Sequence, residues 1–92
     1  MNPEKITVTI SEYSRTDSGK SWRSKPDTIK TESATMDQAN KTTNDDTMSF
    51  FRRLGGYERL ERSYTAYGYL PWILTSISPD KSIKRIREYS YN

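Results

Sequence analysis

The sequence of 92 residues contains no cysteine and no histidine. Without cysteine there can be no disulfide, no thiolate nucleophile and no cysteine-based zinc site, and the lack of a disulfide staple suits a reducing compartment. Without histidine, the usual general base at neutral pH and the commonest transition-metal ligand are both missing. These absences exclude most hydrolase triads and nearly all zinc enzymes. We therefore expect no metal, no cofactor and no catalysis.

Long apolar runs are also lacking. No segment approaches the roughly 18 apolar residues of a membrane-spanning helix. The opening residues MNPEKITVTI have no basic stretch followed by an apolar one, which a secretory signal would require. We therefore expect a soluble protein that stays inside the cell and has no membrane contact.

Apolar residues make up only 32% of the chain, but seven Tyr, two Trp and two Phe are among its residues. Aromatic side chains bury a large area each, so a thin core can be built on them. A chain of this length corresponds to one domain. We expect a single domain over residues 1–92.

Charge is divided unevenly along the chain, whose formal net charge is +3. Residues 52–92 carry eight basic and four acidic side chains, whereas residues 1–51 carry seven basic and eight acidic ones. This polarity could orient the domain in the field of a charged partner.

Alternating apolar and polar residues predict a strand near the N-terminus, because Ile6, Val8 and Ile10 alternate with hydroxyl residues. The following segment is rich in Ser, Lys and Arg, which is typical of turns. The expected boundaries are a strand at about Lys5–Tyr13, a long hairpin loop or two ragged strand ends at Ser14–Pro26, and a short strand at Thr28–Glu32.

A helix is predicted to begin near Ser33 to Thr35 and to end at Gly55-Gly56. Thr35 and Gln38 have the spacing of a capping box, and paired glycines are typical of a helix C-terminus. Residues 42–47 (TTNDDT) are poor helix formers that also offer an N-cap for a second helix. One helix with a weak middle and two shorter helices are both compatible with this pattern.

The C-terminal part predicts three strands, with Gly and Pro between them. Their expected boundaries are Tyr57–Ala66, Leu70–Ser78 and Ser82–Tyr91, with a hairpin turn at Ser78-Pro79-Asp80-Lys81 between the last two. An antiparallel sheet with one face covered by the helix would bury these apolar stripes. We therefore expect an α+β fold of about four to five strands, in the order ββαβββ, packed on one helical region.

Two motifs resemble ligand sites but fail the requirements of those sites. Ser18-Gly19-Lys20-Ser21 resembles the end of a phosphate-binding loop, but Ser14 stands where the first glycine is required. Asp37, Asp45 and Asp46 lack the alternating ligands and closing glutamate of a calcium loop. A tight surface turn and helix capping are the better interpretations.

Basic and tyrosine side chains are interleaved along the C-terminal strands. This mixture is common where proteins bind one another, and it also suits single-stranded nucleic acid, whose bases stack on rings. The structural alternative is that alternate tyrosines form core while the arginines face solvent. Acidic residues within the patch argue against plain nucleic-acid binding. The candidate partner-binding residues are Arg59, Arg62, Tyr64, Tyr67, Tyr69, Lys81, Lys84, Arg85, Arg87 and Tyr89.

Three segments together resemble the phage-encoded anti-CRISPR proteins that inhibit the type I-F surveillance (Csy) complex: KITVTI at the start, SFFRRLGG in the helical region, and the ending SYTAYGYLPWILTSISPDKSIKRIREYSYN. The resemblance covers the full chain but includes no diagnostic motif, so no family residue is carried over. It implies a protein in the cytoplasm of an infected bacterium that binds this CRISPR-Cas ribonucleoprotein complex, through its protein subunits or its crRNA. Target DNA would then be blocked by occupancy, with no small-molecule substrate.

Two further functional interpretations stay open. A small single-stranded nucleic-acid-binding module would use the same basic, tyrosine-rich strands. An enzyme restricted to Tyr, Lys and carboxylates is the weakest, because no arrangement in the sequence would tune their pKa values. The oligomeric state is also open, since an exposed edge strand could pair with a second copy.

Overall fold

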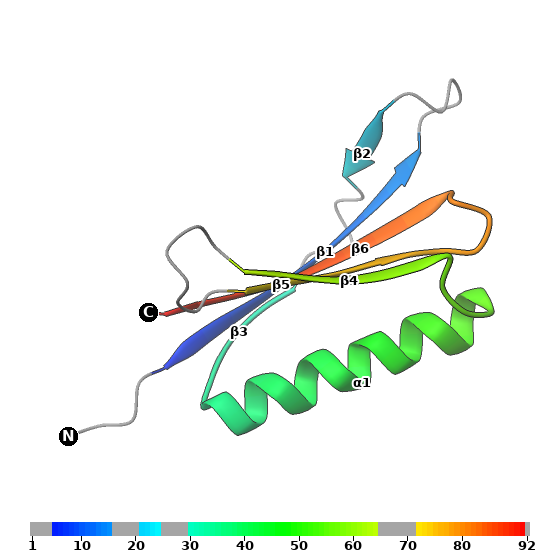
Figure 1. Cartoon of the computed structure of the whole chain (residues 1–92). Helices are drawn as coiled ribbons and strands as arrows, with labels where there is room; N and C mark the ends of the chain where they lie inside the picture. The colour runs from blue at the N-terminus through cyan, green and yellow to red at the C-terminus, as the bar shows by residue number, and fades with distance from the viewer. Residues whose placement is uncertain (1–4, 16–20, 25–29, 65–71, 92) are drawn as a thin grey trace.

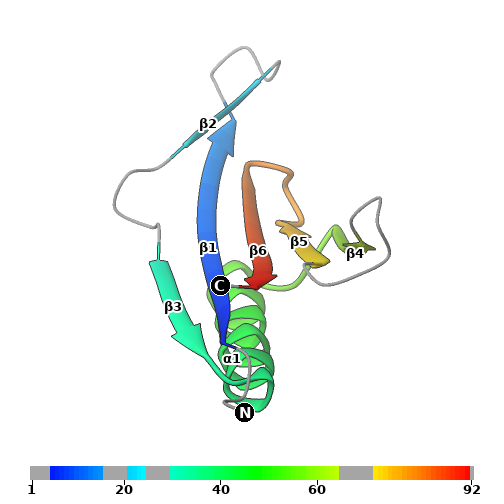
Figure 2. The same cartoon turned by 90° about the vertical axis from the view of Figure 1, so that its left-hand side faces the viewer.

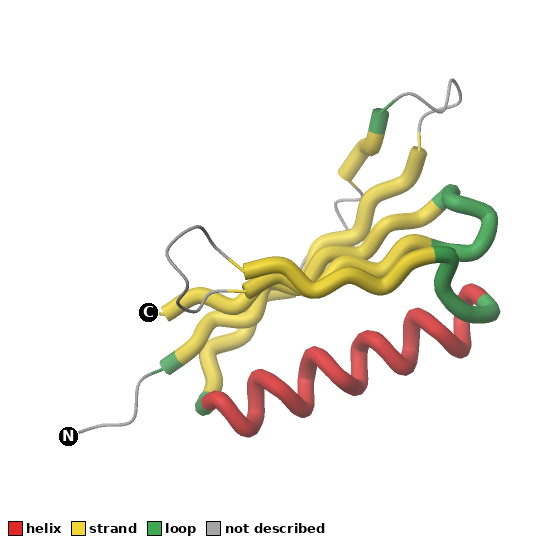
Figure 3. Tube along the Cα trace, viewed as in Figure 1, coloured by secondary structure: helices red, strands yellow, loops and turns green. Residues whose placement is uncertain are grey.

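The computed structural model describes residues 5–15, 21–24, 30–64 and 72–91, and in this part of the chain six strands form one antiparallel sheet with a helix against one face (Figures 1 and 3). The predicted α+β fold is confirmed. The elements are β1 (Ile6–Arg15), β2 (Trp22–Ser24), β3 (Lys30–Ala34), α1 (Met36–Leu54), β4 (Arg59–Tyr64), β5 (Trp72–Ile77) and β6 (Ile83–Tyr91).

The sheet is arranged around the central pair β1 and β6. These strands pair along almost their whole length, from Ile6 opposite Tyr91 to Ser14 opposite Ile83. The other edge of β1 is shared by β3, which pairs with its first half, and β2, which pairs with its last three residues. Beyond β6 lie β5 and then β4, the outer strand on that side (Figure 2).

The strand predictions hold with shifted boundaries. Strand β2 matches the interpretation of residues 14–26 as two strand ends. Strand β3 extends two residues beyond the predicted end at Glu32, and the predicted residues 28–29 lie outside the described residues. The predicted β5–β6 hairpin is confirmed, since Ser78 N–H donates to Ile83 O at 2.9 Å and Lys81 N–H to Ser78 O at 2.9 Å. The predicted strand ends at residues 65–66 and 70–71 lie outside the described residues.

Helix α1 is continuous, so the alternative of two shorter helices is wrong. Its predicted capping box is confirmed: Gln38 N–H donates to Thr35 Oγ1 at 3.3 Å, and Thr35 N–H donates to Gln38 Oε1 at 3.0 Å. Gly55 ends the helix with φ 78°, a left-handed conformation that glycine adopts without steric cost. No helix among the described residues is long and apolar enough to cross a membrane.

Tertiary contacts keep the weak middle of α1 helical. Thr43 and Thr47 are buried against the sheet, and the Thr47 hydroxyl donates to Thr43 O at 2.7 Å. Asp46 turns toward β6 and accepts hydrogen bonds from two arginines. Burial and ion pairing therefore outweigh the poor helix propensity of these residues.

The apolar core lies between the N-terminal part of α1 and the sheet. The predicted inward stripe of β1 is confirmed, because Ile6, Val8 and Ile10 are all buried. The Trp72 and Tyr89 rings are in contact at a tilt of 36°, with centroids 3.9 Å apart, and the Tyr89 hydroxyl donates to Asn40 Oδ1 of the helix at 2.8 Å. The whole cluster is Ile6, Val8, Ile10, Ala34, Ala39, Trp72, Leu74 and Tyr89.

Candidate binding surface

Three of the candidate partner-binding residues lie beneath the helix. Arg87 and Tyr89 have no exposed surface and Arg85 is 7% exposed. The strand register places them on the helix side of the sheet, opposite Ile10, Val8 and Glu12 respectively. The expectation that they belong to an exposed patch is corrected, because their side chains are used inside the domain.

Arg85 and Arg87 are held by a buried ionic network with Glu12 and Asp46. Arg85 makes a two-point contact with Asp46, at 2.8 Å from both Nε and Nη2, and its Nη1 donates to Glu12 at 2.9 Å. Arg87 Nε donates to Asp46 at 2.6 Å and its Nη1 to Ser76 Oγ at 2.8 Å. Arg53, in the last turn of α1, also pairs with Glu12. The interior of the domain therefore contains this ionic network beside the apolar cluster.

Burial and pairing act in opposite directions on the two buried arginines. Burial opposes charge on Arg85, but its hydrogen bonds and charge interactions with Asp46 and Glu12 outweigh burial and raise its pKa. Burial lowers the pKa of Arg87 despite the attraction of Asp46, and the nearby charge of Arg85 lowers it further. Arg87 also lies with its guanidinium carbon 5.8 Å from the centroid of the Phe50 ring.

The face of the sheet away from α1, here called the open face, is left uncovered by the helix (Figure 1). The side chains that alternate with the buried ones point to this face, because successive residues of a strand point to opposite sides. One cross-strand row of the open face runs through Arg59, Ile77, Lys84 and Tyr13. Three of these four residues are half-buried, and Arg59 is exposed.

A basic aromatic cluster, consisting of Tyr13, Arg15, Trp22 and Lys84, forms at the end of the open face near β2. The Arg15 guanidinium carbon lies 4.5 Å from the Trp22 ring centroid, within the range of a cation–π contact. Lys84 Nζ lies 4.8 Å from the Trp22 centroid and 5.2 Å from that of Tyr13. Burial lowers the pKa of Lys84, and the charge of Arg15 lowers it further. The cluster thus holds two cations close together on aromatic rings.

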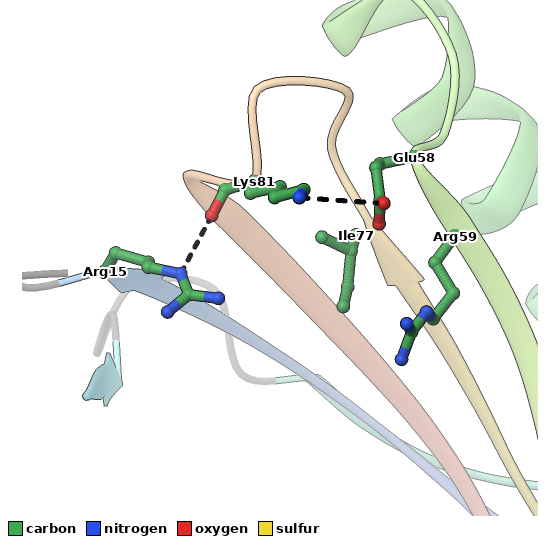
Figure 4. Close-up of a pocket in the computed structure, with 5 residues that line it drawn as sticks. All are labelled: Arg15, Glu58, Arg59, Ile77 and Lys81. Atoms are coloured by element: carbon green, nitrogen blue, oxygen red, sulfur yellow. Dashed lines mark hydrogen bonds and ion pairs between the residues drawn. The ribbon is translucent and has the colours of Figure 1, made fainter. Parts of the chain in front are cut away.

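An open pocket of about 180 Å³ continues from the cluster (Figure 4). Arg15 belongs to both, and its Nε donates to the Lys81 carbonyl oxygen at 3.1 Å. Lys81 Nζ lies 3.9 Å from a carboxylate oxygen of Glu58 on the opposite side of the pocket. The pocket is lined by Arg15, Glu58, Arg59, Ile77 and Lys81, so three cations and one carboxylate surround it.

Asp80 holds the β5–β6 turn that carries Lys81 to the pocket. Its carboxylate accepts from Ser82 Oγ at 2.6 Å, from Ser82 N–H at 2.9 Å and from Ser78 Oγ at 2.8 Å. These hydrogen bonds, with the Ser82 hydroxyl first, stabilise the charged form and lower the pKa of Asp80 from 3.8 to about 2.

We expect Asp80 to make stability depend on pH in a defined acid range. The folded state binds this proton more weakly than the unfolded state, so the stabilisation is complete above the usual pKa of 3.8 and is lost as the pH falls toward 2. Urea midpoints measured across this range should separate the wild type from Asp80→Asn at the upper end and converge at the lower end. Parallel curves for the two proteins would contradict this role.

Of the other candidates, Arg59, Lys81 and Lys84 lie on or beside the open face and are brought together there. Arg62 lies on the opposite face, with its guanidinium carbon 4.5 Å from the Trp72 ring centroid. Tyr67 and Tyr69 lie outside the described residues, as does the side chain of Tyr64.

Three residues of the basic aromatic cluster were not predicted from the sequence: Tyr13, Arg15 and Trp22. Trp22 stands out in the sequence as the one large apolar residue of a polar segment, but this signal alone assigned it no role in binding.

Among the described residues, no group of three or more Asp and Glu side chains is placed to hold a metal ion. Comparison of this chain with protein-family models, with curated proteins and with solved structures finds no match.

Proposed function

We propose that this protein is an inhibitor that binds the crRNA-guided type I-F surveillance complex and blocks target DNA by occupancy, without catalysis, in the cytoplasm of an infected bacterium. The observation that supports binding is the basic aromatic cluster on the open face, the face that the helix does not cover. The choice of partner rests on the resemblance to anti-CRISPR proteins described above. The partner surface is a region of the ribonucleoprotein with both signs of charge, formed by its protein subunits or its crRNA, whose acidic or phosphate groups face the cluster.

The chemistry of the open face suits such a partner. Arg15 and Lys84 are held on rings, so less side-chain entropy is lost when they contact an anion. Aromatic and arginine side chains are enriched in the energetically important parts of interfaces. Glu58 and Glu61 lie near the same surface and pair with Lys81 and Arg59. The mixed charges favour a partner with both signs of charge over a bare polyanion.

A small single-stranded nucleic-acid-binding module is the second candidate, favoured by the location of Trp22 and Tyr13 on the open face of the sheet. In such modules bases stack on aromatic rings while cations follow the backbone. Here Arg15 and Lys84 already contact the Trp22 ring. A base that stacks on a ring face occupied by one of these cations would have to displace that cation. This competition favours the ribonucleoprotein surface over free single strands.

A nuclease-treated pull-down tests the proposal. The tagged protein is incubated with bacterial lysate that contains a type I-F complex, and the bound proteins are identified by mass spectrometry. Recovery of the complex's subunits after nuclease treatment is the expected result. Binding that appears only with intact nucleic acid would overturn the proposal in favour of the second candidate, and its affinity for an oligonucleotide should then fall steeply with salt.

A further inference from the structure

Strand β4 has a free edge at the side of the sheet away from β2 and β3. It pairs with β5 on one side, and among the described residues nothing pairs with its other side (Figure 2). Helix α1 packs against β1 and β3, and its side chains Asn40 and Asp46 bond to β6. Within the described part of the chain, the backbone of β4 is therefore open to another strand, and unpaired edges readily accept one.

The hydrogen-bond pattern shows which β4 residues face outward. Ser78 N–H donates to the carbonyl of Ile83, so the even-numbered residues of β5 point their backbone groups toward β6. The odd-numbered residues, including Ile77, then face β4, where Arg59 and Glu61 lie opposite Ile77 and Thr75. By the same alternation, the N–H and C=O groups of Leu60 and Arg62 point to the free edge.

We propose that two copies of this chain associate through their β4 edges, antiparallel, about a two-fold axis that passes between Leu60 and its counterpart in the second copy. In this register Leu60 faces Leu60 of the second copy, and each Arg59 faces the other copy's Glu61. A two-fold contact must be self-complementary, and this segment of charged residues is self-complementary about Leu60. The sheets of the two copies become one continuous sheet.

Hydrogen bonding and charge together select this register over its neighbours. Outward-facing residues must lie opposite outward-facing residues, so even numbers meet even numbers and odd numbers meet odd numbers. Moving the axis to Glu61 would place two carboxylates opposite each other. Moving it to Arg59 or Arg62 would place two arginines opposite each other. Like charges directly opposite each other are unfavourable in a sheet. The register about Leu60 avoids such pairs.

The side chains at this edge are positioned for the contact. Leu60 is 46% exposed, and the dimer would cover part of that surface. Arg59 Nη1 and Glu61 Oε1 already form an ion pair at 3.1 Å within one chain, so both side chains lie on the open face and have opposite charges within reach. In the dimer each would gain a partner from the second copy.

The contact is confined to one strand, so it buries less surface than most stable dimers and the association is expected to be weak. The axis is perpendicular to the sheet, so the open faces of both copies point the same way. Two basic aromatic clusters would then face the same side, which would let one dimer bind an extended partner at two points.

Charge exchange at the edge tests this register. Arg59→Glu and Glu61→Arg each place like charges opposite each other at two symmetric positions, so each should weaken the dimer by about tenfold or more. The double exchange Arg59→Glu with Glu61→Arg restores opposite charges and should recover the dimer. Sedimentation velocity of the full chain over a wide concentration range measures the dissociation constant.

The control is Arg23→Glu, which makes the same charge change on β2 at the other side of the sheet and should leave the dimer unchanged. Circular dichroism confirms that each variant is folded. A wild-type chain that stays monomeric at the highest soluble concentration would overturn the proposal. Equal weakening by the single and double exchanges, or by Arg23→Glu, would overturn this register.

Discussion

Replacing Asp46 with alanine is expected to lower the free energy of unfolding by about 3–5 kcal/mol, the range for removing one partner of a buried ion pair. The Asp46 carboxylate accepts hydrogen bonds from Arg85 and Arg87, and Arg87 has no exposed surface. Its loss would leave two guanidinium groups inside the domain with only Glu12 to balance them. Small domains have total stabilities of about 5–15 kcal/mol, so this loss is a large share. Urea unfolding followed by tryptophan fluorescence measures it.

Asp45→Ala is the matched control for this prediction. Asp45 precedes Asp46 in the same helix, but its side chain is 67% exposed and pairs with Lys41 on the surface. Exposed ion pairs of this kind contribute little, so the variant should unfold close to the wild type. A loss for Asp46→Ala no larger than that for Asp45→Ala would show that the network does not stabilise the fold.

Asp46→Asn separates the charge of Asp46 from its shape. The amide keeps the volume of the side chain and one acceptor oxygen, but it cannot neutralise two arginines. We expect Asp46→Asn to lower the free energy of unfolding, but by less than Asp46→Ala does. Because the network is buried, salt should screen this effect much less than it screens surface pairs.

The parts of the fold that were predictable from sequence depend on local signals. The inward stripe of β1 follows from strict alternation of Ile6, Val8 and Ile10 with hydroxyl residues. The ends of α1 follow from a capping box and paired glycines, whose hydrogen bonds connect residues no more than a few positions apart. Such signals can be read without knowing what packs against them.

Which face of β6 is buried could not be predicted from such local sequence signals. Its isoleucines, Ile83 and Ile86, point to opposite sides of the sheet, so the strand has no clean apolar alternation. The side that is buried carries Arg85 and Arg87, and their partner Asp46 lies 39 and 41 positions away in the chain. Only docking of the helix on the sheet brings these charges together.

The candidate surface was missed in part for a related reason. Trp22 lies in a polar segment whose composition indicates a loop, and its position becomes meaningful only when β2 pairs with the end of β1. That pairing places Trp22 opposite Arg15, within reach of Lys84 from β6. A cluster built from three strands has no signature in any one of them.

The double variant Trp22→Ala with Lys84→Ala is expected to weaken binding to the type I-F complex by roughly 30-fold or more, the effect of removing an energetically dominant contact. The pair removes the ring on which Arg15 lies as well as the second cation of the cluster. Affinity for the purified complex is measured by biolayer interferometry, and circular dichroism confirms folding.

The matched control for this variant removes one aromatic and one lysine from elsewhere on the surface. Tyr91 is 48% exposed and shares the side of β6 that faces the helix, and the Lys41 side chain is 77% exposed on α1. Tyr91→Ala with Lys41→Ala should therefore bind as the wild type does. If both double variants weaken binding equally, the effect follows from overall charge and aromatic content, and the basic aromatic cluster is not the contact. If only Trp22→Ala with Lys84→Ala weakens binding while the fold is intact, the open face is the surface that meets the complex.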